Sequence, residues 1–114
     1  GALGILKADT GELVLKKGIK CPRHCYASLI LAGDQLIATS ERGNMVVMQA
    51  TAEATEISRN KLPAMVPERS APNQKHGIIG TPAVAAGRLY VRAQHYLYCI
   101  GKTDKAAKES SVAR

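Results

Sequence analysis

The fold is decided by a stretch that occurs twice, first as Ala27-Ser-Leu-Ile-Leu-Ala-Gly-Asp-Gln-Leu-Ile-Ala-Thr-Ser-Glu-Arg-Gly-Asn-Met-Val-Val-Met48 and again as Gly80-Thr-Pro-Ala-Val-Ala-Ala-Gly-Arg-Leu-Tyr-Val-Arg-Ala-Gln-His-Tyr-Leu-Tyr-Cys-Ile100. Each copy runs from a small hydroxyl residue into an apolar strand, a tight turn, a second strand, a polar turn and a third strand. The copies are 53 residues apart, and the offset falls to 52 at the second turn. A period of this length is typical of solenoids, propellers and other repeat arrays.

Turn signals divide the chain into short strands. Asp9-Thr10-Gly11 predicts a hairpin turn within residues 4–20, because Asp bonds its own backbone and Gly accepts a positive φ. Gly33-Asp34 and Glu41-Arg42-Gly43-Asn44 predict two further turns. We therefore expect additional strands at about residues 27–32, 35–40, 44–50, 53–61, 81–86, 88–93 and 96–101.

The apolar pattern of the first copy indicates strands that are covered on both faces. Residues 35–39 and 45–48 do not alternate cleanly between polar and apolar, and continuous apolar runs of this kind fit doubly covered strands. Four-stranded antiparallel sheets stacked face to face are typical of β-propeller blades. A two-layer sandwich is the alternative architecture, and it predicts stronger alternation. We therefore expect an all-β fold of about two such blades and part of a third, in an incomplete propeller.

Three segments resemble one known family. Asp9-Thr10-Gly11-Glu12, followed by Leu15, resembles a Thr-Gly-x-x-x-Trp blade end with Leu in place of the Trp. Residues 26–43 resemble a blade opening, and residues 80–101 resemble a terminal blade as far as the closing Leu-Tyr-Cys-Ile-Gly. On these motifs the chain is similar to the C-terminal blades of pyrroloquinoline-quinone-like (quinoprotein-type) β-propeller repeat proteins.

The resemblance implies an organisation by blades. We expect the end of a preceding blade with its connector at 1–25, a blade at 26–62, an inter-blade loop at 63–78, the last blade at 79–101 and a flexible tail at 102–114. Propellers usually close with four to eight blades. We therefore expect this chain to be a fragment of a longer protein, although closure of a ring by self-association is an alternative.

The composition narrows the classes of partner. The chain has 16 basic and 9 acidic residues, a net charge of +7, and neither Trp nor Phe. The basic residues are scattered and are not interleaved with an aromatic stacking platform, so we do not expect nucleic acid as the partner. No apolar run approaches the ~20 residues of a membrane-spanning helix, so we expect no membrane span. The expected partners are other blades of the same propeller or other proteins.

Two of the three cysteines and one histidine form the only cluster of soft metal ligands in the sequence. Cys21, His24 and Cys25 could supply three ligands to zinc, but the sequence has no second pair of ligands at the usual spacing. A Cys21–Cys25 disulfide and unpaired loop thiols are the alternatives. Ser28 and Thr81 occupy matched repeat positions, which predicts a structural hydrogen bond at a strand start and not a pair of nucleophiles.

No catalytic residues and no cofactor can be assigned from the motifs. The quinone-binding and calcium-binding residues of the family have no counterpart here, so none is carried over. Loop residues often mediate binding, and we expect an interaction loop around Arg69, Lys75 and His76. The expected function is that of a non-catalytic scaffold or protein-interaction surface. The alternative is part of a quinone-dependent dehydrogenase whose active site lies outside this chain. The resemblance alone implies a bacterial periplasmic or secreted location.

Overall fold

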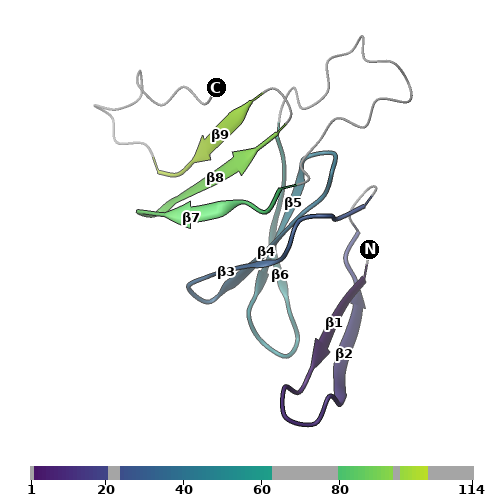
Figure 1. The fold of residues 1–114 in the computed structure, drawn as a ribbon. Coiled ribbons are helices and arrows are strands. Elements are labelled where there is room, and N and C mark those ends of the chain that lie inside the picture. Colours follow the sequence, from purple (N-terminus) through teal and green to yellow (C-terminus); the bar gives the residue numbers. More distant parts are fainter. Residues whose placement is uncertain (1, 21–23, 63–79, 94–95, 103–114) are drawn as a thin grey trace.

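The described residues form an all-β structure. The computed structural model describes residues 2–20, 24–62, 80–93 and 96–102, which form three antiparallel sheets (Figure 1). The all-β antiparallel class predicted from the sequence is therefore confirmed. None of these residues forms a helix long and apolar enough to cross a membrane.

The three sheets follow one another along the chain. The N-terminal sheet pairs two strands, β1 (Ala2–Leu6) and β2 (Leu13–Gly18). The middle sheet has four in sequential order, β3 (Ile30–Ala32), β4 (Gln35–Thr39), β5 (Asn44–Gln49) and β6 (Glu56–Lys61). The C-terminal sheet has three, β7 (Ala83–Ala85), β8 (Arg88–Arg92) and β9 (Leu97–Ile100).

The strand register reproduces the internal repeat. In the middle and C-terminal sheets, the first hairpins close with the pairs Ala32–Gln35 and Ala85–Arg88, which lie 53 residues apart. Each hairpin turn therefore has two residues, and Gly33 and Gly87 occupy these turns with φ of 62° and 72°. Glycine adopts such values without steric cost, so these glycines favour the tight turns, and in the second turn Ala86 also has a positive φ, of 49°. The next hairpins pair Thr39 with Met45 and Arg92 with Leu97, where the offset falls to 52.

One face of the middle sheet packs against the N-terminal sheet. Ala38, Val46 and Met48 are buried on this face together with Leu3 and Ile19. Successive side chains of a strand point to opposite faces, so the residues between them must pack on the other side.

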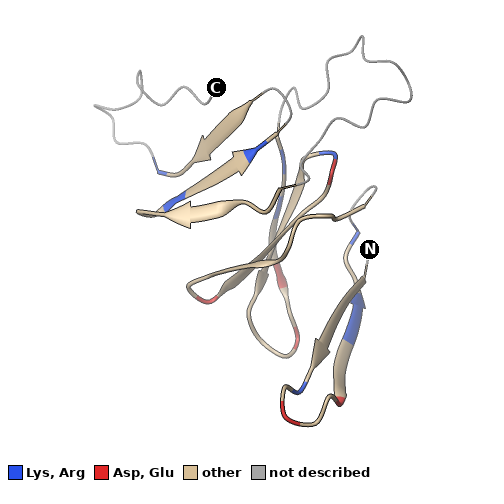
Figure 2. Cartoon of the chain, viewed as in Figure 1, with Lys and Arg blue, Asp and Glu red and all other residues tan. Residues whose placement is uncertain are grey.

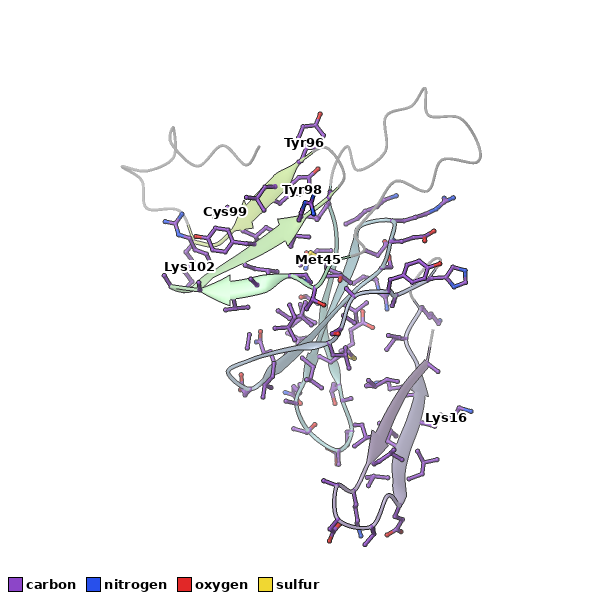
Figure 3. All side chains as sticks on the ribbon, viewed as in Figure 1. Lys16, Met45, Tyr96, Tyr98, Cys99 and Lys102 are labelled. Carbon is purple, nitrogen blue, oxygen red and sulfur yellow. The ribbon has the colours of Figure 1, made fainter. Side chains whose placement is uncertain are left out.

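The opposite face packs against the C-terminal sheet. Ile37 and Met45 are buried there with Leu62, Val91 and Ala93. Met45 lies between the middle and C-terminal sheets (Figure 3). The middle sheet is thus covered on both faces, as its continuous apolar runs predicted.

Polar contacts also join neighbouring sheets. Lys17 on β2 donates a hydrogen bond from Nζ to the carbonyl oxygen of Ala54, at 3.2 Å. Before β3, the backbone N–H of Ser28 donates to Oγ1 of Thr81, at 3.0 Å. The Thr81 hydroxyl therefore makes the structural hydrogen bond predicted for this position, whereas Ser28 takes part through its backbone, and the contact links the segments that lead into two successive sheets.

Two details differ from the expected strands and blades. β3 and β7 begin later than residues 27 and 81, and Pro82 contributes to the second delay because it lacks a backbone N–H. The sheets have two, four and three described strands, so only the middle sheet has the four strands of a blade, and the described strands do not close a ring. The predicted loop at 63–78 and nearly all of the predicted tail at 102–114 lie outside the described residues.

Truncating a methionine on either face of the middle sheet should destabilise the protein. We expect Met45→Ala and Met48→Ala each to lower the free energy of unfolding by about 2–5 kcal/mol, because each leaves a cavity in one of the two cores. Urea denaturation followed by circular dichroism measures the change. Leu31→Ala, at a side chain that is 64% exposed, is the control and should change stability by less than about 0.5 kcal/mol. A neutral effect at one methionine would show that its face is not covered.

The bond between Ser28 and Thr81 can be tested with a matched pair of variants. Thr81→Val removes the acceptor and should lower the free energy of unfolding by about 0.5–1 kcal/mol, while water partly compensates because both residues are exposed. Thr81→Ser keeps the hydroxyl and should lie closer to the wild type in the same denaturation experiment. Equal stability of the two variants would contradict a stabilising role for this bond.

Candidate interaction surface

The structure describes only some of the residues predicted to be functional. Cys21 and the interaction-loop residues Arg69, Lys75 and His76 lie outside the described residues. His24 and Cys25 are described, and both are exposed in the connector between β2 and β3. The predictions for Cys21 and for the loop therefore stay predictions.

The local structure around His24 holds the connector against the middle sheet. The carbonyl oxygen of His24 accepts a hydrogen bond from the backbone N–H of Glu41, at 2.8 Å. The His24 ring lies 5.7 Å from the ring of Tyr26, with the planes inclined by 45°. Within the described ranges, no group of three or more His, Cys, Asp or Glu side chains could hold a metal ion. The described part of the chain thus brings no third ligand to His24 and Cys25.

The face of the C-terminal sheet that points away from the middle sheet carries charged and aromatic side chains. Along β8, Val91 is buried and Leu89 packs against the core shared with the middle sheet. The alternation of a strand therefore directs Arg88, Tyr90 and Arg92 to the opposite face. Both arginines are exposed and Tyr90 is half-buried. We call these three residues the Arg–Tyr–Arg row.

The neighbouring strand β9 contributes to the same face. Tyr90 pairs with Cys99 and Arg92 pairs with Leu97, so these four side chains share the outer face. Nη1 of Arg88 lies 3.9 Å from Sγ of Cys99, in a weak hydrogen bond that holds the guanidinium over β9. Leu97 is 48% exposed. The outer face therefore combines two cations with an aromatic ring and an exposed aliphatic side chain.

Charge distinguishes this sheet from the other two. Residues 80–102 contain no Asp or Glu, whereas Arg88, Arg92 and Lys102 are cationic. Figure 2 shows basic positions but no acidic ones on the C-terminal sheet, while acidic residues are coloured along the other two sheets. With a chain net charge of +7, this face attracts anionic groups at neutral pH.

The sequence alternation predicts Tyr90 on the face opposite Leu89 and Val91, but the basic residues look scattered along the chain, so the sequence does not group the two arginines with Tyr90. The signal was the strict alternation of residues 88–92, which places Leu89 and Val91 on one side and the three polar-tipped residues on the other. That pattern shows amphipathicity. It does not show which face remains exposed.

Two tyrosines lie at the end of the C-terminal sheet near the start of β9. The rings of Tyr96 and Tyr98 are 6.0 Å apart and inclined by 53° (Figure 3). Burial raises the pKa of Tyr98, and the nearby Tyr96 raises it further. The Tyr98 hydroxyl is therefore protonated at neutral pH and keeps its hydrogen-bond donor.

Glu56 and Arg59 form the strongest described ion pair. Nε and Nη2 of Arg59 each donate to one carboxylate oxygen of Glu56 at 3.0 Å, and Nη1 donates to the carbonyl oxygen of Lys20. The hydrogen bond from Arg59 lowers the pKa of Glu56 below its ordinary value of 4.5. The guanidinium thus joins β6 to the segment that follows β2.

Stability should depend on pH through this pair. A carboxyl whose pKa is lower in the folded state stabilises the fold fully above its unfolded pKa, and the effect disappears as the pH falls through the folded pKa. We therefore expect Glu56→Gln to be less stable than the wild type at about pH 7, with a gap that narrows as the pH falls below 4.5 and through the folded pKa of Glu56. The urea midpoint of each protein is the measurement. Glu53→Gln, at an exposed acid in the β5–β6 turn, is the control, and a gap that persists at low pH would contradict the assignment.

No known family model matches this chain, and no curated protein shows significant similarity to it.

Proposed function

We propose that this chain is a non-catalytic segment of stacked β-sheet repeats from a quinoprotein-like β-propeller, and that it acts as a rigid scaffold and protein-interaction surface. The observation that carries the proposal is the middle sheet, whose two faces pack against successive sheets of the same chain. Stacks of this kind are built from repeats that cannot bury their apolar faces alone. The register offset of 53 and then 52 residues between two of the sheets supports the same view.

The outermost sheets support a role in assembly. Leu13 and Val14 on β2 are 55% and 44% exposed, and Leu97 on β9 is 48% exposed. Exposed aliphatic side chains on the terminal sheets of a stack are suited to contact with a further sheet or another protein. Lys16, which points away from the middle sheet (Figure 3), adds a polar group to the N-terminal surface.

The Arg–Tyr–Arg row supports protein binding. Arg and Tyr are enriched where protein surfaces contribute most to binding, because they combine large contact areas with hydrogen-bond donors. The row lies on a paired strand, so its spacing is set by the backbone and does not depend on a loop. The proposal includes no cofactor, and the periplasmic or secreted location that accompanies it derives from the family resemblance alone.

A binding test separates this proposal from the dehydrogenase alternative. We expect that adding pyrroloquinoline quinone and Ca²⁺ to the purified chain gives no absorption band that elutes with the protein on size exclusion. A co-eluting chromophore would overturn the non-catalytic assignment. The chain without quinone and Ca²⁺ is run on the same column with light scattering, and its far-UV circular dichroism should give a β-sheet spectrum. A chain without β-sheet signal would contradict the stacked-sheet scaffold.

A further inference from the structure

The outer edge of β9 carries backbone groups that no described strand satisfies. β9 pairs with β8 along one edge, and no other described strand pairs with it. The backbone N–H of Ala93 donates to the carbonyl of Tyr96 at 2.8 Å, which makes this pair a hydrogen-bonded one. Hydrogen-bonded and non-hydrogen-bonded pairs alternate along an antiparallel ladder. The N–H and C=O groups of Leu97 and Cys99 therefore point to the outer edge.

The middle sheet shows what such an edge accepts. Met45 and Val47 on β5 correspond to Leu97 and Cys99 at the offset of 52 residues. In the middle sheet these positions pair with Asn60 and Ser58 of β6, an antiparallel fourth strand. The repeat therefore provides a complete example of the pairing that β9 lacks among the described strands.

Among the other described edge strands, β2, β3, β6 and β7 are protected in ways that β9 is not, whereas β1 is also uncharged. β6 carries charged side chains at Glu56, Arg59 and Lys61, and β2 carries Lys16 and Lys17. β3 and β7 have only three residues each. Charges and short length are the usual devices that prevent an edge from pairing with another chain. β9 has four uncharged residues and no proline, so its edge is suited to receive a strand.

The positive charge around the edge of β9 indicates which kind of strand can pair with it. The guanidinium of Arg88 lies over β9, Arg92 is paired with Leu97, and Lys102 follows the strand at its far end. A second copy of this chain would bring two such cationic groups together, and like charges across an interface oppose binding. A strand with acidic side chains would instead pair with these cations.

We propose that the outer edge of β9 binds an extended segment of another protein, in antiparallel orientation, with acidic side chains four residues apart that face Arg88 and Arg92. This spacing follows from the strand, because Arg88 and Arg92 are four residues or about 13 Å apart and the docked strand has the same rise per residue. Backbone bonds to Leu97 and Cys99 provide affinity, and the arginines provide specificity. The inference rests on the protein-interaction role proposed above and names the partner class.

The test uses a fluorescent peptide, Thr-Glu-Val-Thr-Val-Glu-Thr, and measures its anisotropy with the full chain. We expect saturable binding that weakens about tenfold or more in Leu97→Pro, since the loss of one outward N–H removes a backbone hydrogen bond. Pro is tolerated at the first residue of an edge strand, and circular dichroism checks the fold. Leu97→Ala keeps the N–H and is the matched control, with an expected change of less than about threefold.

A second pair of measurements tests the charge selection. Arg92→Gln should weaken binding of the peptide several-fold, whereas Arg42→Gln, at an exposed position in the β4–β5 turn, should not. A peptide with Lys in place of both Glu residues should bind at least about tenfold more weakly.

Several results would overturn the inference. The first is that the Leu97→Pro and Leu97→Ala variants bind the peptide with equal affinity, and the second is that the chain binds the Glu and Lys peptides with equal affinity. The third is that light scattering shows a dimer of the chain, which Leu97→Pro abolishes. A large loss of stability in Leu97→Pro without peptide would mean that the chain covers its own edge. Tighter binding of single-stranded DNA, unaffected by Leu97→Pro, would assign the surface to nucleic acid. If the folded chain binds neither peptide nor quinone, only this inference fails and the scaffold proposal stands.

Discussion

The structure depends on one constraint, which is that the central strands of the middle sheet are apolar on both faces. Val46 and Met48 are buried against one neighbouring sheet, and Met45 is buried against the other. A sheet of this kind is unstable in water unless both faces are covered, because each buried aliphatic side chain contributes on the order of 1.5–3 kcal/mol. Because the chain has no Trp or Phe, each core between two sheets buries mainly aliphatic and methionine side chains and is therefore small. Stability therefore comes from stacking sheets and not from one large core.

Polar contacts add direction to this stack. The guanidinium of Arg59 binds the carboxylate of Glu56 and also donates to the carbonyl oxygen of Lys20. It therefore links β6 to the segment that follows β2. The contact between Ser28 and Thr81 links the segments that enter the middle and C-terminal sheets. Such bonds contribute little individually at the surface. They favour one relative placement of neighbouring sheets, which apolar contacts alone do not specify.

The same architecture explains where partners can bind. The two inner interfaces use the alternating apolar side chains, so the chemically distinct residues lie on the outer face of the C-terminal sheet and along the edge of β9. The Arg–Tyr–Arg row is held by strand pairing, with Arg88 further positioned by Cys99. A surface built on paired strands keeps its geometry before a partner arrives, which reduces the entropic cost of binding. Scaffold and interaction surface are therefore two consequences of one stack.

The sequence by itself determined the short-range features of this protein. Gly33 and Gly87 mark turns that need a positive φ, the apolar runs mark doubly covered strands, and the 53-residue and 52-residue offsets mark the repeat. These signals are local, so they can be read residue by residue. Only the tertiary structure decided that Ser28 meets Thr81, that Arg88, Tyr90 and Arg92 remain on an outer face, and that β9 has no described neighbour on one side. A repeat shows which residues are equivalent, whereas the stacking of sheets determines which of them touch and which stay exposed.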